Sequence, residues 1–269
     1  MIDIRATEKA RQHYPDAILV SYFIEAFLAF TKLTLGIGEK QIAFLTSICS
    51  DDLNNVGMPK TGMVGPFVQG GLDGYPFAGK TGVGAFSHHL PEKGAAMMFV
   101  GPHVGVTQTG LVGKVIRPGQ KTPSDCCGAA AHGLRKLEAG EIKPKKPSEF
   151  AEDDYQQEKL EQLILRHKDE ILKAGQQGGP ERFICMSELL YREEMQAFTH
   201  LLESAHFGDP AFVFGGIVIN EDAGKESSIA LRDAGRIEKG KYEDMTEKFM
   251  QYSEPKFKDL HEGNTDVFR

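Results

Sequence analysis

The segment Ile42-Ala-Phe-Leu-Thr-Ser-Ile-Cys-Ser-Asp-Asp52 begins with a mostly apolar run and ends in a cysteine and, after one serine, two aspartates. An apolar run of this length is too short for a typical helix and indicates a buried strand. A second run of this kind, Ala95 to Val100, ends at Gly101-Pro-His103. Because α/β proteins place functional groups at the carboxyl ends of such strands, these polar side chains are candidates for one site. The sequence predicts an α/β fold with a central sheet flanked by helices.

Helices are expected on both sides of these strands. The apolar run from Ala17 to Leu35 predicts a helix with little polar surface, which Gly36 and Gly38 would end. In a later apolar run the pair Gly215-Gly216 predicts a bulge or a close approach of backbone. The other expected elements are a hairpin at Gly105 to Arg117, a helix from Cys127 to Leu137, amphipathic helices at Asp154 to Ala174 and at Met186 to His206, a strand at Ala211 to Asn220, and a helix-prone tail from Gly235.

The chain is predicted to form a single α/β domain over residues 1–269. Its parts are an N-terminal helical segment (1–40), a half that carries the candidate site (41–137), a connector (138–150), and a last part with helices, the final core strand and the C-terminal tail (151–269). The connector is expected to be exposed because Lys143-Pro-Lys-Lys-Pro147 suits neither a helix nor a central strand.

The composition argues against several classes of protein. A net charge of −7 argues against nucleic acid as a main partner, because contact with phosphates requires an excess of Lys and Arg. Four cysteines are too few for a disulfide scaffold and predict reduced thiols. The N-terminus lacks the features of a signal peptide, and no apolar run reaches the roughly 18 residues that a membrane span needs. We expect a cytoplasmic protein, or one of an organelle stroma if a targeting leader has been removed, without a membrane partner.

Glycine is concentrated between Gly57 and Gly133, where more than half of the chain's 30 glycines lie. Such a density weakens helices and strands and is typical of backbone that turns tightly or approaches a ligand closely. A long flexible loop is the alternative, but loops of this length are uncommon in compact domains unless they are functional. The region is therefore predicted to form the wall of a small site.

Two cysteine thiolates and one imidazole, with the fourth position open, are a known arrangement for catalytic zinc. Cys49, His103 and one of the adjacent cysteines Cys126 and Cys127 would supply that set. Their spacing matches no short zinc-finger pattern, so the fold itself must bring them together; otherwise the cysteines are small buried apolar residues. Asp51 would lie in the outer sphere of the metal or in its open position, unless it only caps the following turn.

Two further features bear on function. His88 is one of two adjacent histidines and would shuttle protons if it lies at the mouth of the site, although an exposed loop histidine without a role fits equally well. The segment Gly74 to Thr81 matches the phosphate-loop pattern G-x-x-x-x-G-K-[ST]. Its flanks suit that motif poorly, since Val68 to Asp73 makes a weak strand and Gly82 to Gly84 a weak helix start. Nucleotide binding is therefore the lesser alternative.

Five motifs follow one another along the chain: Cys49-Ser-Asp-Asp, the run from Gly70 to Gly82, Gly101-Pro-His-Val-Gly105, Cys126-Cys-Gly-Ala129 and Gly215-Gly-Ile-x-Ile-Asn220. This ordered set resembles the limiting-CO2-inducible protein B/C (LCIB/LCIC) family, which is related to β-type carbonic anhydrases. The resemblance implies a β-carbonic-anhydrase-like fold, a homodimer or higher homo-oligomer, and Zn2+ bound by Cys49, His103 and Cys127. Cys127 is preferred to Cys126 because β-type enzymes place the last ligand directly before a glycine.

The resemblance also implies an activity, the interconversion of CO2 and bicarbonate through zinc-bound hydroxide. In β-type enzymes an arginine holds the carboxylate that corresponds to Asp51, but this chain has no arginine between Arg11 and Arg117. Lys60 or Lys80 is expected to take its place, with less favourable geometry. The missing arginine leaves a non-catalytic zinc- or bicarbonate-binding homologue as the alternative. The candidate catalytic residues are Asp51, His88 and Lys80.

Overall fold

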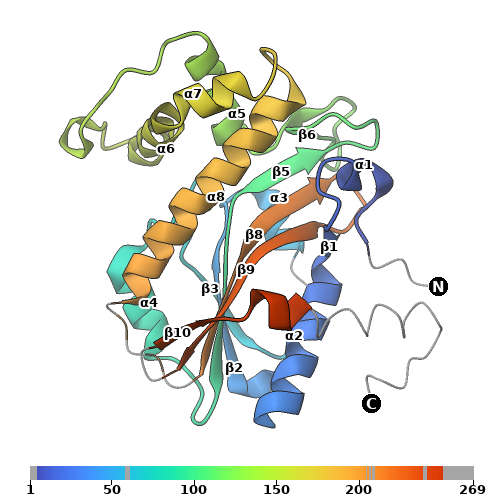
Figure 1. Cartoon of the computed structure of the whole chain (residues 1–269), viewed down its shortest axis with the longest axis vertical. Coiled ribbons are helices and arrows are strands. Elements are labelled where there is room, and N and C mark those ends of the chain that lie inside the picture. The colour runs from blue at the N-terminus through green and yellow to red at the C-terminus, as the bar shows by residue number, and fades with distance from the viewer. Residues whose placement is uncertain are drawn as a thin grey trace.

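The chain folds around a mixed 8-stranded β-sheet with helices on both faces (Figure 1). The computed structural model describes residues 5–57, 61–203, 205, 207, 210–238 and 241–250. The predicted α/β fold, a central sheet flanked by helices, is confirmed. The strands of the large sheet are β1 (Ile18–Leu19), β2 (Ile42–Ser47), β3 (Val64–Val68), β4 (Ala95–Val100), β5 (His103–Val106), β8 (Ala211–Glu221), β9 (Ser228–Glu238) and β10 (Lys241–Asp244), and a small second sheet holds β6 (Lys114–Val115) and β7 (Ser124–Asp125).

The strand order brings the predicted site segments to the middle of the large sheet. The order is β1-β9-β8-β4-β2-β3, with β10 beside β9 and β5 beside the second half of β8. Strands β3, β2, β4 and β8 run parallel to one another, whereas β9 is antiparallel to β8. Because β2 and β4 are parallel and adjacent, their carboxyl ends meet, and Cys49 and Gly101 follow at the same end of the sheet.

Helices form layers on the two faces of the sheet (Figure 1). The helix α2 packs on one face, whereas α4 and α8 pack on the other. The helices α5, α6 and α7 pack beside α8, and α5 meets α6 across the segment 138–150 that is predicted as a connector. The helices are α1 (Glu8–Arg11), α2 (Val20–Leu35), α3 (Asp52–Gly57), α4 (Gly79–Ser87), α5 (Gly128–Glu138), α6 (Tyr155–Arg166), α7 (Lys168–Lys173) and α8 (Pro180–Leu202), with 3-10 turns η1 (Glu39–Gln41) and η2 (Pro147–Glu149).

Aromatic side chains hold α2 to the sheet. Phe23 and Phe27 are buried and meet Phe214 of β8 edge to face, with ring centroids 5.1 and 5.3 Å apart. Such pairs stabilise the core beyond the burial of their apolar area. The helix ends at Gly36, whose φ of 68° is a conformation that glycine adopts without strain. Away from the sheet, Leu33 is 71 % exposed, so the helix is not buried all round in the single chain.

A bulge in β8 brings two backbone segments together beside the predicted site. The pairing of β8 with β9 shifts register between Gly215 and Gly216, as the Gly-Gly pair predicts. Gly101 lies against this bulge, and a Cβ built on it would be 1.7 Å from the carbonyl oxygen of Gly216. Only glycine fits here, two residues before β5 begins at His103.

Several sequence predictions are wrong in extent. The region Asp154 to Ala174 forms two helices, α6 and α7, that are separated at His167, and α8 begins at Pro180 instead of Met186. The predicted hairpin turns as expected, but β6 pairs with β7. The tail from Gly235 is predicted to be helix-prone: 246–250 are helical, but 235–238 belong to β9 and 241–244 form β10. Residues 251–269 lie outside the described residues.

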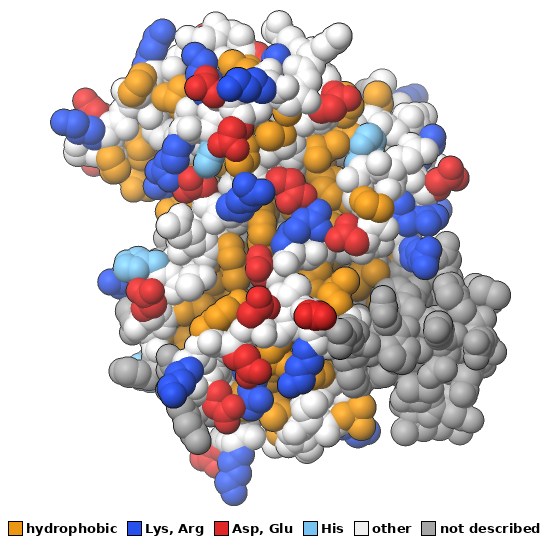
Figure 2. Space-filling model, in the orientation of Figure 1, with side chains coloured by type: hydrophobic (Ala, Val, Ile, Leu, Met, Phe, Trp, Pro, Cys, Tyr) orange, Lys and Arg blue, Asp and Glu red, His pale blue; other side chains and the backbone are white. Residues whose placement is uncertain are grey.

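The described surface carries charges of both signs. Figure 2 shows Lys and Arg side chains interspersed with Asp and Glu over the visible face. Within the described ranges, none of the helices combines the length and the apolar character that crossing a bilayer requires.

Candidate metal centre

Three side chains converge at the carboxyl end of the parallel strands. Cys49 lies two residues beyond β2, His103 begins β5, and Cys127 is the N-cap residue of α5. Their ligand atoms all lie within 4.8 Å of one another. The three side chains are at most 5 % exposed. The structure thus brings together, from three separate elements, the three metal ligands that the sequence predicts. A Cys/His/Cys group of this kind can bind a metal ion.

Without a bound cation, the surroundings of Cys49 and Cys127 disfavour the deprotonated, thiolate form of both side chains. The sulfur atoms of Cys49 and Cys127 are 3.8 Å apart. The hydrogen bond to Cys127, together with burial, raises the pKa of Cys49. At Cys127 the same hydrogen bond acts in the opposite direction, but burial and the charge of Asp73 raise the pKa of its thiol. The backbone N–H of Asp73 donates to the Cys49 sulfur at 3.2 Å, a bond that suits a metal-bound thiolate.

The imidazole of His103 has one engaged and one unpartnered nitrogen. Its Nδ1 lies 2.7 Å from Asn220 Oδ1, which accepts hydrogen bonds, so Nδ1 carries the proton. Its Nε2 is buried and has no hydrogen-bond partner within the part of the chain that the structure describes. Buried polar atoms are rarely left without a partner, and a metal ion would satisfy this one. The residues present therefore fit a bound metal ion.

Cys126 lies on the Nδ1 side of the same ring. Its sulfur is 3.5 Å from His103 Nδ1 and 3.5 Å from Asn220 Oδ1. With Asp51 and His103 it forms a second set of ligand atoms that lie within 4.8 Å of one another. Because Asn220 already engages Nδ1, the geometry favours the first set, which contains Cys127.

Asp51 has an arginine partner, so the prediction that the chain lacks one is wrong. Arg117 Nη2 lies 2.7 Å from Asp51 Oδ2, and the two side chains are 17 % and 12 % exposed. Asp51 Oδ1 accepts a hydrogen bond from the N–H of Leu53, so the carboxylate also caps the start of α3. Each carboxylate oxygen thus has a fixed partner. Of the two lysines expected to replace the arginine, Lys60 lies outside the described residues and Lys80 makes no ion pair with Asp51 in them.

Arg117 is itself held by several groups. Its Nε lies 3.2 Å from Asp52 Oδ1, and its Nη1 donates to Ser124 Oγ at 2.7 Å and to the carbonyl oxygen of Asp125 at 3.0 Å. Burial opposes its charge, but Asp51 and Asp52 raise the pKa of the guanidinium. The arginine follows β6, 66 residues after Asp51. Sequence reasoning sought it in the segment just after Cys49 and therefore missed it.

Two buried acids beside the metal group are further residues that sequence reasoning missed. Among the described residues, the carboxylate oxygens of Asp73 and Glu194 have no hydrogen-bond partner. Burial raises the pKa of Asp73 to about 6 and that of Glu194 well above its usual value. Glu194 lies one turn from Leu190 and one from Phe198 on the buried face of α8. Glu194 could have been found from the sequence, because a carboxylate on the apolar face of a predicted helix indicates a buried acid.

Lys80 and His88, the other predicted catalytic residues, are exposed at the two ends of α4. In the described part of the chain, neither is joined to the Cys/His/Cys group by a hydrogen bond or an ion pair. Figure 1 shows α4 beside the C-terminal end of α8, whereas α5 lies toward the other end of that helix. The structure does not bring these two side chains to the metal group, and their catalytic roles stay predictions.

The segment Gly74 to Thr81 runs from a loop into α4, which begins at Gly79, so the prediction of a weak helix start is wrong. The backbone N–H groups of Tyr75, Phe77 and Gly79 donate to carbonyl oxygens of the same loop. These donors are therefore not available to surround a phosphate group. The geometry gives no support to nucleotide binding at this loop.

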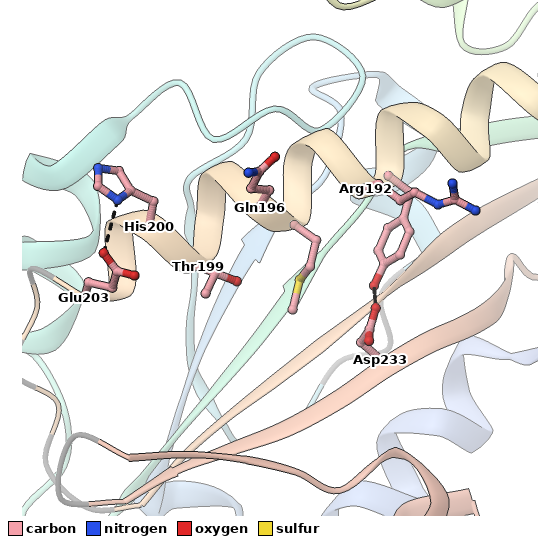
Figure 3. Close-up of a pocket in the computed structure, with 8 residues that line it drawn as sticks. Arg192, Gln196, Thr199, His200, Glu203 and Asp233 are labelled. Carbon is pink, nitrogen blue, oxygen red and sulfur yellow. Dashed lines mark hydrogen bonds and ion pairs between the residues drawn. The ribbon is translucent and has the colours of Figure 1, made fainter. Parts of the chain in front are cut away.

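A surface pocket of about 550 Å³ lies along α8 and reaches β9. Tyr191 donates a hydrogen bond to Asp233 there, and His200 Nδ1 lies 3.2 Å from Glu203. The lining includes none of the candidate metal ligands, so we do not assign this pocket to the metal centre. The labelled residues in Figure 3 are Arg192, Gln196, Thr199, His200, Glu203 and Asp233.

The fold and the site define a class of α/β proteins in which a Cys/His/Cys group lies at the ends of parallel strands, next to an aspartate–arginine pair. Residues 21–246 match the family model described as limiting CO2-inducible proteins B/C beta carbonic anhydrases. The match spans most of the sequence, and the chain belongs to this family. No curated protein matches the chain.

Two solved structures share this fold. The crystal structure of PtLCIB4, a homolog of the limiting CO2-inducible protein LCIB, matches with a TM-score of 0.73 at 22% identity, over 88% of this chain and 98% of that one. The crystal structure of LCIB matches with a TM-score of 0.66 at 16% identity, over 89% of this chain and 98% of that one. At these identities the similarity demonstrates the fold alone.

Proposed function

We propose that the chain is a zinc-dependent carbonic anhydrase that interconverts CO2 and bicarbonate. The observation that carries the proposal is the buried group of Cys49, His103 and Cys127, with Asp51 held by Arg117 beside it. Zinc held by two thiolates and one imidazole keeps a fourth position open, where it lowers the pKa of water to about 7 and so supplies a nucleophile near neutral pH.

The protein side chains would divide the remaining work. Cys49, Cys127 and His103 Nε2 would hold the ion. Asp51 would stay out of the metal's fourth position because Arg117 and the Leu53 N–H engage its oxygens. A carboxylate with a fixed position can still accept a hydrogen bond from water and orient it. The salt bridge therefore supports an open site, the feature that a hydratase needs.

The surroundings suit a small, weakly polar substrate. Cys49 and Cys127 belong to a buried apolar cluster that includes Val104, Ala130 and Ile217. Burial in such a cluster strengthens electrostatic interactions at the metal and limits the access of bulk water. The non-catalytic alternative depended on a missing arginine, and Arg117 removes that argument.

The test is to measure zinc per chain and CO2 hydration on one sample as purified, after chelation, and after zinc is returned. We expect one zinc per chain and hydration above the buffer rate that disappears and returns with the metal. Zinc without hydration would leave only a metal-binding homologue. Absence of zinc from protein that was purified without chelators would refute the site itself.

A further inference from the structure

A buried chain of polar side chains extends from His103 on the side of the ring away from Nε2. We propose that Asn220 is the positioning residue of the metal centre, and that it fixes both the tautomer and the orientation of His103. This inference rests on the proposed metal-binding role of His103 and Cys49. Asn220 is 1 % exposed and lies near the end of β8, after the apolar stretch of that strand.

The donor and acceptor roles in this row of side chains can be assigned by starting from the backbone carbonyl oxygen of Cys49. Asn54 Nδ2 lies 3.1 Å from the carbonyl oxygen of Cys49, which can only accept, so the amide group of Asn54 must face it. The oxygen of Asn54 then faces Asn220, whose Nδ2 donates to it at 3.4 Å and to Ser227 Oγ at 3.0 Å. Asn220 Oδ1 is left pointing at His103.

The consequence is a single tautomer for the neutral imidazole. Because Asn220 presents an acceptor at 2.7 Å, neutral His103 carries its proton on Nδ1 and keeps a lone pair on Nε2. Nε2 is one of the buried atoms at the site that have no hydrogen-bond partner among the described residues. A metal-binding histidine is typically oriented by a hydrogen bond at its other nitrogen, and here a side-chain amide provides it.

The scaffold makes this positioning rigid. Asn220 pairs with Gly105 across the parallel strands β5 and β8, two residues along from the pair of His103 with Val218. Asn54 belongs to α3, the helix that follows Cys49 and Asp51. The side-chain amides of Asn220 and Asn54 therefore connect the His103 ring to the backbone of Cys49. Two of the three proposed ligands are thus oriented together.

The test compares zinc affinity, measured by competition with a chelator, in wild type, Asn220→Leu and Asn220→Asp. Leucine removes the acceptor at similar volume, and we expect affinity to fall about 10- to 100-fold. Aspartate keeps an acceptor toward Nδ1 but has no donor for Asn54 Oδ1, and we expect it to restore part of the loss. In cadmium-loaded, nitrogen-15-labelled protein, wild type should show coupling of cadmium to Nε2 and a persistent Nδ1–H signal, which Asn220→Leu should lose.

Two further variants separate positioning from folding. Ser187→Ala removes another buried hydrogen-bonding group, which bonds Tyr14 and the carbonyl of Ile184, and should lower stability without changing zinc affinity. Asn54→Ala leaves His103 and Asn220 in place and should still weaken zinc binding, roughly tenfold. The latter keeps the inference testable if Asn220→Leu does not fold.

The inference and the proposed function fail in different ways. Wild-type protein without zinc would refute the proposed metal centre. Wild type that binds zinc, with Asn220→Leu and Asn54→Ala binding equally tightly and an unchanged Nδ1–H signal, would overturn the role of Asn220 alone.

Discussion

Replacing Arg117 with alanine is expected to lower the rate of CO2 hydration about 100-fold while the chain keeps its zinc. The guanidinium holds Asp51 Oδ2 at 2.7 Å. Without it, the carboxylate can turn toward the metal and take the position that the reacting water needs. Zinc content and hydration are measured on the same samples, because we expect the hydration rate to fall while the zinc content stays the same.

A nearby arginine provides the matched control. Arg135 pairs with Asp125 at 3.0 Å and is 56 % exposed, so Arg135→Ala removes a positive charge from the same neighbourhood without touching Asp51. Exposed pairs contribute little, and we expect a near wild-type rate. Arg117→Lys should fall between the two, since lysine keeps the charge but loses the two-pronged geometry. Wild-type hydration in Arg117→Ala would show that the salt bridge does not keep the site open.

The second large effect concerns the adjacent cysteines. Cys127→Ser is expected to lose the bound zinc, because the sulfur that lies 3.8 Å from Cys49 is a ligand in our account. Cys126→Ser should retain about one zinc per chain, since its sulfur faces Nδ1 of His103 instead. Metal analysis of both variants after purification without chelators decides between them. Zinc that persists in Cys127→Ser and disappears in Cys126→Ser would transfer the ligand role to Cys126.

The parts of the fold that follow from local pattern could be predicted from the sequence. The run Ala95 to Val100 becomes β4 with the predicted bounds, because a strand buried on both faces has no polar residues along it. In contrast, β9 carries Arg232 and Asp233 amid apolar residues, and β3 is a short, largely exposed strand with Pro66 inside it. Their pairing depends on neighbouring strands, which local pattern does not reveal.

The same distinction applies to the site. Cys49 and His103 could be predicted as site residues because each follows shortly after an apolar run that indicates a buried strand. Arg117 reaches Asp51 only through the segment that follows β6, and Asn220 reaches His103 only through the pairing of β5 with β8. Such partners are set by tertiary structure. The single-domain organisation and the homo-oligomer implied by the resemblance stay predictions.

X-ray absorption at the zinc edge of purified wild-type protein tests the central claim most directly. The account predicts two sulfur neighbours at about 2.3 Å and two lighter neighbours at about 2.0–2.1 Å, one of them an imidazole and the other an exchangeable oxygen. Exchange of that oxygen should be visible as a change in the spectrum when a small anion is added. A zinc shell without two sulfurs, or one that no small anion alters, would contradict an open site built from Cys49, His103 and Cys127.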